Sequence, residues 1–365
     1  MAATSPTPAA AQPGVTHSDR YWREAMAPYA KPVLWRSILD IFTAPVPFVI
    51  GFALMYMSLD TSYWLTLLIS IPTAGFLLRT FILFHDCTHG SFFESKTANT
   101  WGGRIFGLMV FQCFANWRHH HALHHGSAGD LDRRGDGDVP TWTVDEYFSK
   151  PFMSRLGYRL FRHPAIMFGI GPLWSLLIGP RIWANSKSTR LRNSILLTNL
   201  AVVVMVGALM AILGVVPVLL IYAPLILLAG TAGVWLFFVQ HQFEDVYWEN
   251  NDAWSYSTAA LQGSSYLKLP QPLQFFTGNI GLHHVHHLSS RVPNYSLQRA
   301  HDGVDAFDDV PVLTFWRSMR CSRLKLWDER TKQLVTFGEG RRSFDAHGAA
   351  ARPTVTQTPA MTRLR

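Results

Sequence analysis

The sequence is poor in charge and in cysteine, and each shortage excludes a class of protein. Only 15% of the 365 residues are charged, whereas 48% are hydrophobic and the mean hydropathy is +0.11. Soluble domains carry about 25% charged residues, so this balance indicates a membrane protein. The three cysteines, Cys87, Cys113 and Cys321, are widely spaced and form no C-x-x-C pair. A disulfide framework and a thiolate metal site are therefore not expected.

The N-terminal segment lacks the features of a cleaved signal peptide. Its first 19 residues contain no Lys or Arg, and no charged segment is followed by an apolar core. Residues 1–30 are predicted to be a disordered tail, residues 31–340 one membrane domain, and residues 341–365 a second disordered tail. The net charge is +8, but no basic run is interleaved with aromatic residues, so no nucleic-acid partner is expected.

Four segments are apolar and long enough to cross a bilayer. They are residues 41–57, 63–84, 195–216 and 218–239. A helix of about 22 residues is about 33 Å long, which matches a hydrocarbon core of about 30 Å. The first two segments are joined by residues 58–62 and the last two by little more than Pro217. These short connections predict two helical hairpins with their tips on one side. Arg79 is the only charged residue in the four segments, and we expect its side chain to snorkel to the interface.

The basic residues predict which side of the membrane each segment faces. Neither hairpin tip contains Lys or Arg, whereas four basic residues precede the first segment and seven lie between residues 155 and 192. Cytoplasmic loops are enriched in Lys and Arg, so both termini and residues 85–194 are predicted to be cytoplasmic. Residues 101–114 and 164–178 are apolar but too short to span, and we interpret them as interfacial or re-entrant helices. The predicted fold is an all-α integral membrane protein, with four transmembrane helices in two hairpins and a cytoplasmic helical cap.

The histidines are clustered: twelve of the 16 lie between residues 85 and 125 or between 241 and 287. One cluster has the pattern H-x-x-x-H and two have the pattern H-x-x-H-H. Positions i, i+3 and i+4 share a helix face, so each cluster is predicted to direct its imidazoles at a common point. His241 follows the fourth segment as His85 follows the second, which makes it a ninth candidate. The candidate metal ligands are His85, His89, His121, His124, His125, His241, His283, His286 and His287.

This set of ligands restricts the chemistry. Imidazole binds Fe, Zn, Cu and Ni, and eight or nine nitrogens suit two metals with open positions rather than one closed tetrahedral site. A metal transporter would place ligands within its spans, and no predicted span contains a histidine. Two adjacent redox metals at a membrane surface suit O2 activation and attack on a C–H bond. Zinc lacks redox chemistry, so iron is the leading candidate.

The sequence around the clusters resembles the histidine boxes of the membrane-bound fatty acid desaturase family, most closely its bacterial acyl-lipid members. The matching segments are FHDCTHGSFF at residues 84–93, NWR at 116–118 before His121, GNIGLH at 278–283 and SRVPNY at 290–295. The resemblance extends from about residue 35 to 335. It implies that the nine histidines bind two non-haem irons.

The resemblance also implies an activity: O2-dependent insertion of a cis double bond into a lipid-linked acyl chain, with Δ12/ω-6 or similar regioselectivity. No His-Pro-Gly-Gly haem motif occurs, so two electrons are expected from a separate carrier, ferredoxin or flavodoxin. The implied location is the bacterial inner membrane, with the active site on the cytoplasmic face. A related hydroxylase, ketolase or alkane monooxygenase is the alternative, and a histidine-rich metal transporter is a remote one.

Several other residues near the clusters are candidates for supporting roles around the metal ligands. His119, His120 and His284 fall outside the family pattern, and we expect them to form hydrogen bonds outside the metal ligands or to face water. Candidates to hold the remote ring nitrogens are Asp86, Asp130, Asp132, Asp138 and Glu244. Phe237 stands where related acyl-CoA desaturases have an Asn that reaches a metal through water. Gln240 and Gln242 are candidates to replace that Asn.

Overall fold

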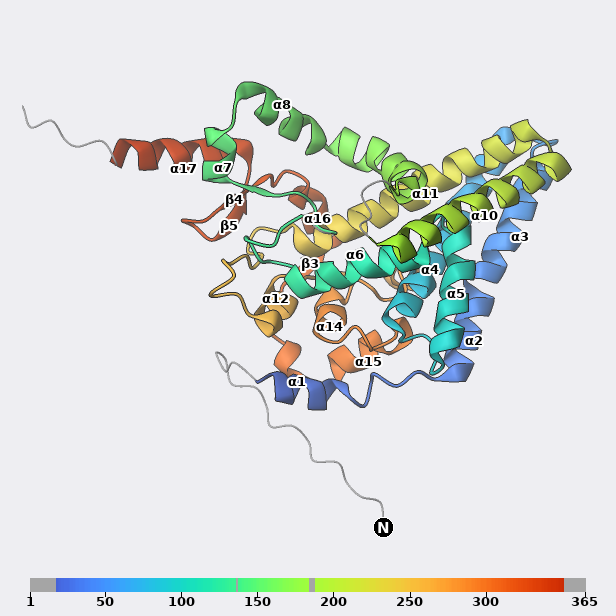
Figure 1. Ribbon diagram of the computed structural model, residues 1–365, viewed down its shortest axis with the longest axis horizontal. Helices are drawn as coiled ribbons and strands as arrows, with labels where there is room; N and C mark the ends of the chain where they lie inside the picture. Colours follow the sequence, from blue (N-terminus) through green and yellow to red (C-terminus); the bar gives the residue numbers. More distant parts are fainter. Residues whose placement is uncertain (1–17, 136, 184–187, 351–365) are drawn as a thin grey trace, which may run out of the picture.

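The computed structural model describes residues 18–135, 137–183 and 188–350, and this part of the chain is mostly helical (Figure 1). Within it, four helical segments are long and apolar enough to cross a membrane, as predicted. The first, Leu34–Ser58, consists of α2 (Leu34–Thr43) and α3 (Pro45–Ser58). The others are α4 (Tyr63–His89), α10 (Thr189–Leu213) and α11 (Val215–His241). Each is longer than the predicted segment: α4 and α11 continue to their histidines, whereas Leu34–Ser58 and α10 begin earlier.

The break between α10 and α11 lies at Gly214, not at Pro217 as predicted. Gly214 has a φ of 91°, which glycine adopts without the steric penalty of a side chain. Pro217 lies in the first turn of α11, where its missing N–H group leaves no helical hydrogen bond unmade. Helices α2 and α3 are separated at Ala44, which precedes Pro45 and leaves the helical region as residues before proline tend to do.

Arg79 does not snorkel to the interface, so that prediction was wrong. Its side chain is buried, and Nη2 donates to Oδ1 of Asp40 in α2 at 2.7 Å. Nη1 donates to the carbonyl of Phe275, in the short helix α13 (Gln271–Phe276), which packs against α4. A cation within a membrane span needs such partners. The sequence could not show them, because Asp40 and Phe275 are remote from Arg79 along the chain.

Most of the remaining elements form a cap at one end of the spanning helices, at the left and bottom of Figure 1, whereas α5 (Lys96–Met109) lies at the right beside α4. The other α-helices are α1 (Asp19–Met26), α6 (Phe114–Ser127), α7 (Val144–Ser149), α8 (Phe152–Phe161), α9 (Gly171–Leu173), α12 (Tyr256–Gln262), α14 (His283–Leu288), α15 (Leu297–Asp302), α16 (Phe315–Cys321) and α17 (Phe337–Ala350). Single turns of other helix types occur at η1 (Ile166–Ile170), η2 (Trp174–Ile178), η3 (Gly179–Arg181), η4 (Asn294–Ser296) and η5 (Asp305–Phe307).

The cap also contains five short strands, so the all-α prediction was wrong in this part of the fold. The strands are β1 (Trp142–Thr143), β2 (Tyr266–Lys268), β3 (Val312–Thr314), β4 (Leu326–Asp328) and β5 (Gln333–Val335). In one sheet β4 pairs in parallel with β1 and antiparallel with β5, and in the other β2 and β3 are parallel. The strands have two or three residues, too few to give an alternating pattern in the sequence.

The two apolar stretches that were predicted not to span lie against the spanning helices. Helix α5 packs along α4, and Phe111, two residues after α5, places its ring 5.4 Å from that of Tyr222 in α11. Residues 166–178 pack on α11, where Thr231 Oγ1 donates to the carbonyl of Phe168 at 2.7 Å. Neither stretch forms a helix long enough to cross a membrane.

The folded part of the chain begins earlier and ends later than predicted. Residues 18–30 were assigned to a disordered tail, but α1 buries Trp22 and Met26 against the cap. Helix α17 likewise occupies residues 337–350, and Phe344 packs on Phe148. Both helices mix a few large apolar residues with several charged ones, which gave little signal in the sequence. Residues 1–17 and 351–365, the rest of the predicted tails, lie outside the described residues.

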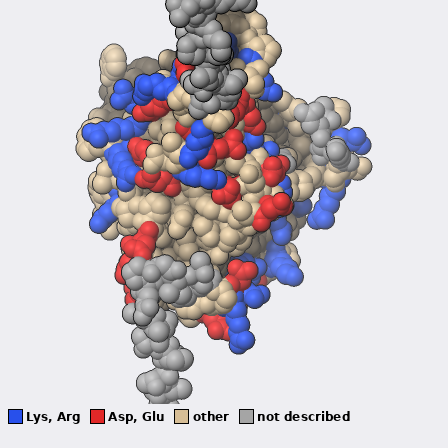
Figure 2. Space-filling model, turned by 90° about the vertical axis from the view of Figure 1, so that its left-hand side faces the viewer, with Lys and Arg blue, Asp and Glu red and all other residues tan. Residues whose placement is uncertain are grey.

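Charged residues gather on the side of the cap that faces left in Figure 1. Figure 2 shows Lys and Arg intermixed with Asp and Glu over this face. Many large apolar side chains of the spanning helices are exposed, among them Trp64, Leu197 and Ile212. This division agrees with spanning helices in lipid and a cap in water.

Candidate metal centre

The nine predicted ligands converge on two adjacent groups, and no other histidine among the described residues belongs to either group. One contains His85, His89, His121, His125 and His286, and the other contains His124, His241, His283 and His287. One ligand atom from each residue lies within 4.8 Å of the others in its group. We refer to these as the five-histidine group and the four-histidine group. Their rings are in contact, since those of His125 and His287 stack at 4.2 Å.

Four helices supply the ligands. His85 and His89 lie in the last turn of α4, and His241 ends α11, so two spanning helices project their final residues into the cap. Helices α6 and α14 supply the two H-x-x-H-H triples. Helix α4 ends directly afterwards at Gly90, whose φ of 66° is the left-handed conformation that commonly ends helices.

Each triple is divided between the two groups, so the prediction that a triple directs its rings at one point was wrong. On α6, His121 and His125 join the five-histidine group while His124 joins the four-histidine group. On α14, His283 and His287 join the four-histidine group while His286 joins the other. Positions i and i+4 lie nearly in line, but position i+3 is rotated about 100° from i+4. One helix can therefore serve two metals.

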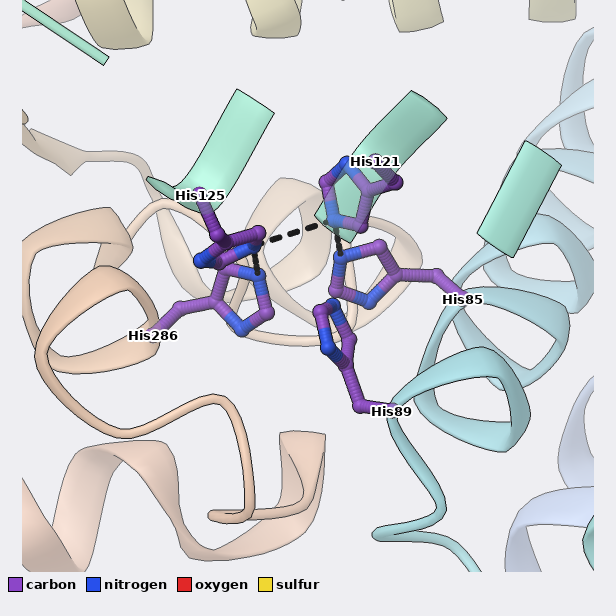
Figure 3. Close-up of side chains that lie close together, drawn as sticks. All are labelled: His85, His89, His121, His125 and His286. Carbon is purple, nitrogen blue, oxygen red and sulfur yellow. Dashed lines mark hydrogen bonds between the residues drawn. The ribbon is translucent and has the colours of Figure 1, made fainter. Parts of the chain in front are cut away.

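Within each group the Nε2 atoms approach one another closely (Figure 3). Nε2 of His121 lies 3.0 Å from that of His85 and 3.1 Å from that of His125, which in turn lies 3.0 Å from that of His286. In the four-histidine group, Nε2 of His241 lies 3.2 Å from that of His124 and 3.0 Å from that of His283. Nitrogens that converge in this way suit a cation placed between them.

Burial keeps the ligands in the form that binds metals. Burial lowers the pKa of His121, His125, His283, His286 and His287 well below the usual value, and neighbouring imidazoles lower it further. These rings are therefore neutral near pH 7, with a lone pair free for coordination.

Two buried Nε2 atoms lack hydrogen-bond partners, which supports a metal ion in each group. Nε2 of His89 and Nε2 of His287 are buried without a hydrogen-bond partner. A buried polar atom without a partner is costly, and a metal ion within each group would satisfy it. The donors are all imidazole nitrogens, which suit Fe, Zn, Cu or Ni, and five donors exceed a closed tetrahedral zinc site.

Hydrogen bonds at Nδ1 fix the orientation of three ligand rings. Nδ1 of His124 donates to Asp138 Oδ1 at 2.6 Å, Nδ1 of His85 lies 3.3 Å from Asp86 Oδ1, and Nδ1 of His241 donates to the carbonyl of Gly263 at 2.9 Å. With Nδ1 occupied, Nε2 is left for the metal. The carbonyl of Gly263 was not predicted, because a backbone acceptor has no sequence signature.

Only two of the five predicted acidic partners thus contact a ligand. Asp130 instead accepts from Arg133 Nε and from the backbone N–H of Asp132. Asp132 accepts from the N–H of Asn251. Glu244 faces Arg317, with a closest N–O distance of 3.5 Å. These three residues support the loops around the site rather than the rings.

A buried polar network behind His85 escaped the sequence analysis. Asn294 donates from its backbone N–H to Asp86 Oδ2 at 2.7 Å and from Nδ2 to the same atom at 3.0 Å. The same Nδ2 donates to Asp40 Oδ2 at 2.9 Å, and Asp40 also pairs with Arg79. Asn294 belongs to the SRVPNY segment after the third cluster, so its position beside a histidine box was the available signal.

The off-pattern histidines lie outside both groups, as predicted. His284 is fully buried, and its Nε2 lies 3.1 Å from Nδ1 of His301. His119 and His120 are on the exposed side of α6, with their rings in contact at 5.3 Å.

Neither glutamine near the end of α11 takes the place of the missing Asn. Gln240 donates from Nε2 to the carbonyl of Ile280 at 2.9 Å. Gln242 accepts from Arg162 Nη2 at 2.7 Å and donates to Thr141 Oγ1 at 3.1 Å. The ring of Phe237 instead lies 5.3 Å from His124 and 5.8 Å from His241. Among the described residues, the four-histidine group therefore gains no fifth ligand.

The chain is similar in sequence to known proteins. The sequence model of the fatty acid desaturase family matches residues 62–318. A fatty acid desaturase of Bacillus subtilis is 42% identical over 323 residues, which cover 88% of this chain and 92% of that protein. An sn-1 oleoyl-lipid 12-desaturase of Synechocystis is 27% identical, covering 73% of this chain and 74% of the relative. An sn-1 acyl-lipid omega-3 desaturase (ferredoxin) of the same organism is 26% identical, covering 75% of this chain and 76% of that relative.

Proposed function

Because the chain belongs to the fatty acid desaturase family, a family of oxidoreductases, we propose that it inserts a cis double bond into the acyl chain of a membrane lipid. The observation that carries the proposal is the convergence of nine buried or half-buried histidines into two adjacent groups, with room for two irons. The names of two Synechocystis relatives support an acyl-lipid substrate, and one of them supports Δ12 regioselectivity.

The residues of this chain would hold, orient and shield the irons. The nine histidines are the proposed ligands, and Asp138, Asp86 and the Gly263 carbonyl fix ring tautomers. When bound, two irons and O2 supply the oxidising power that removes a hydrogen from each of two neighbouring methylenes. The Trp117 ring lies 4.1 Å from that of His121 and 5.5 Å from that of His85, so it shields this side of the five-histidine group from water. A site closed to water protects the oxidising chemistry from side reactions.

The remaining two electrons would come from a separate carrier. We infer a ferredoxin or flavodoxin, and the name of the omega-3 relative supports ferredoxin. The chain would act as one domain over residues 31–340, extended by α1 at its start and by the rest of α17 at its end.

The decisive experiment is expression in a host that makes no polyunsaturated lipids, followed by mass spectrometry of its fatty acids and of metal in the purified protein. We expect a new cis double bond in lipid-linked acyl chains and about two irons per chain. A hydroxylated or oxidised chain would indicate the related monooxygenase chemistry instead. Zinc alone in protein made under iron-replete conditions would contradict the di-iron proposal.

The proposed topology places both hairpin tips outside a bacterial inner membrane and the cap in the cytoplasm. Reporters fused after Lys96, Ser149 and Lys268 should therefore read cytoplasmic, and a reporter within residues 58–62 should read external. This topology rests on two observations. Lys and Arg are confined to the cap side, and His85 and His241 lie at the same ends of α4 and α11. An external reading at Ser149 with a cytoplasmic one at Lys96 would require an additional crossing and would overturn this topology.

A further inference from the structure

A hollow of about 270 Å³ lies on the cap surface between α1, α12 and the end of α14. Trp22, Tyr256 and Leu288 form its apolar lining, and Asp19 and Arg23 form its charged lining. Two hydroxyls, of Ser257 and Ser289, complete it. None of the nine histidines lines the hollow.

The hollow has two short connections to His287. Tyr256 donates its hydroxyl hydrogen to the carbonyl oxygen of His287 at 2.6 Å. Leu288, which lines the hollow, is the peptide neighbour of His287. A hydrogen bond and a covalent path therefore both join the wall of the hollow to one ligand of the four-histidine group.

A third connection leads to another ligand of the same group. The Trp22 ring stacks on Phe307, with centroids 5.7 Å apart and planes 10° apart. Phe307 contacts the ring of His284 edge-on at 5.1 Å, and His284 is the peptide neighbour of His283. His283 and His287 both belong to the four-histidine group. All three paths from the hollow thus reach the same half of the site.

We propose that this hollow is the docking point of the electron carrier, a ferredoxin, and that electrons enter through the four-histidine group. The inference rests on the proposed desaturase function. Electron tunnelling weakens steeply with distance and is favoured by covalent bonds, hydrogen bonds and rings in contact, which is what the three paths provide. Tyr and Arg are among the residues enriched at the energetic centres of protein–protein interfaces, and the hollow exposes Tyr256 and Arg23, while Trp22 is buried in its wall. This composition favours a protein partner over a small ligand.

The electron count requires such a carrier. Reduction of O2 to two waters takes four electrons and four protons. Two electrons and two protons come from the two hydrogens removed from the acyl chain. The ferredoxin supplies the other two electrons, one at each docking, and is oxidised, while two protons come from solvent.

The test compares two arginines of α1 by the same charge reversal. Arg23 lines the hollow, whereas Arg20 does not and pairs with Glu24 on the exposed surface. The full chain in detergent would be titrated with a plant-type [2Fe–2S] ferredoxin on a biosensor. Arg23→Glu should weaken binding about tenfold, a typical loss at an interface centre, whereas Arg20→Glu should change it less than about twofold. Hydrogen exchange of residues 19–26 would verify that α1 stays folded in both variants.

Hydrogen exchange with bound ferredoxin provides a second measurement, and we expect protection in α1 and α12. Ferredoxin oxidation, followed by its absorbance, should slow in Tyr256→Phe because the hydrogen bond to His287 is lost, while reduction by dithionite stays unchanged. Equal ferredoxin affinity in Arg23→Glu and wild type, or protection confined to another surface, would overturn the docking site. Binding of lipid vesicles, but not of ferredoxin, at this hollow would also overturn the proposed docking site. If wild type given dithionite and O2 forms no double bond, the proposed function fails instead.

Discussion

Replacement of His121 by Ala is expected to reduce the desaturated product at least about 100-fold, because even the loss of a residue that only supports a metal ligand costs about 10–100-fold. Nε2 of His121 lies 3.0 Å from that of His85 and 3.1 Å from that of His125, at the centre of the five-histidine group. Its loss would leave four donors and open the group beside Trp117. Fatty acid analysis and iron content per chain would both be measured.

His119→Ala is the matched control for this experiment. It makes the same substitution on the same helix two residues away, on the exposed side of α6. We expect its product and iron content to stay within about twofold of wild type, in keeping with the small effects of surface substitutions. His284→Ala is a poorer control, because His284 is fully buried against His301 and its removal would leave a cavity. Wild-type product from His121→Ala would remove His121 from the ligand set.

Replacement of Arg79 by Met is expected to lower the free energy of unfolding by about 3–5 kcal/mol, the usual cost of removing one partner of a buried ion pair. Arg79 and Asp40 are both buried, and their closest N–O distance is 2.7 Å. The variant would leave the Asp40 carboxylate buried without a counter-ion. Asn294 links that carboxylate to Asp86 beside His85, so we also expect weaker iron retention.

Unfolding in detergent, measured by tryptophan fluorescence during heating, would test this prediction. Arg104→Met is the matched control, because Arg104 is exposed and lies over Trp101 on the surface of α5. The double variant with Asp40→Asn should recover part of the loss, since the unpaired charge is then gone. A transition of Arg79→Met that coincides with that of Arg104→Met would show that the pair contributes nothing to stability.

The spanning helices and the nine converging histidines could be predicted from the sequence because both depend on local patterns. A run of about 20 apolar residues identifies a span by its length alone. The H-x-x-x-H and H-x-x-H-H spacings place imidazoles on one side of a helix whatever surrounds it. His241 was found by the same reasoning, as the residue at the end of a span. The structure brings all nine of these histidines together.

The division of these histidines into five and four required the tertiary structure. Spacing shows that His121, His124 and His125 lie on neighbouring faces of α6, but only the positions of α4, α11 and α14 decide which group each face meets. The small sheets of the cap also depend on the tertiary structure, since β1 pairs with β4 and β2 with β3 from remote segments, whereas β5 forms a local hairpin with β4.

Local patterns in the sequence thus identify the four apolar spans and the nine histidines that converge. The environment of these histidines depends on the fold. Asn294 reaches Asp86 across 208 positions of the chain, and Arg79 is neutralised by Asp40 from another helix. Helix α1 is placed by burial of Trp22, whose ring stacks on Phe307, and of Met26 in the same cluster. Such contacts join residues that are distant in sequence, and their energy comes from burial and pairing that no local pattern records.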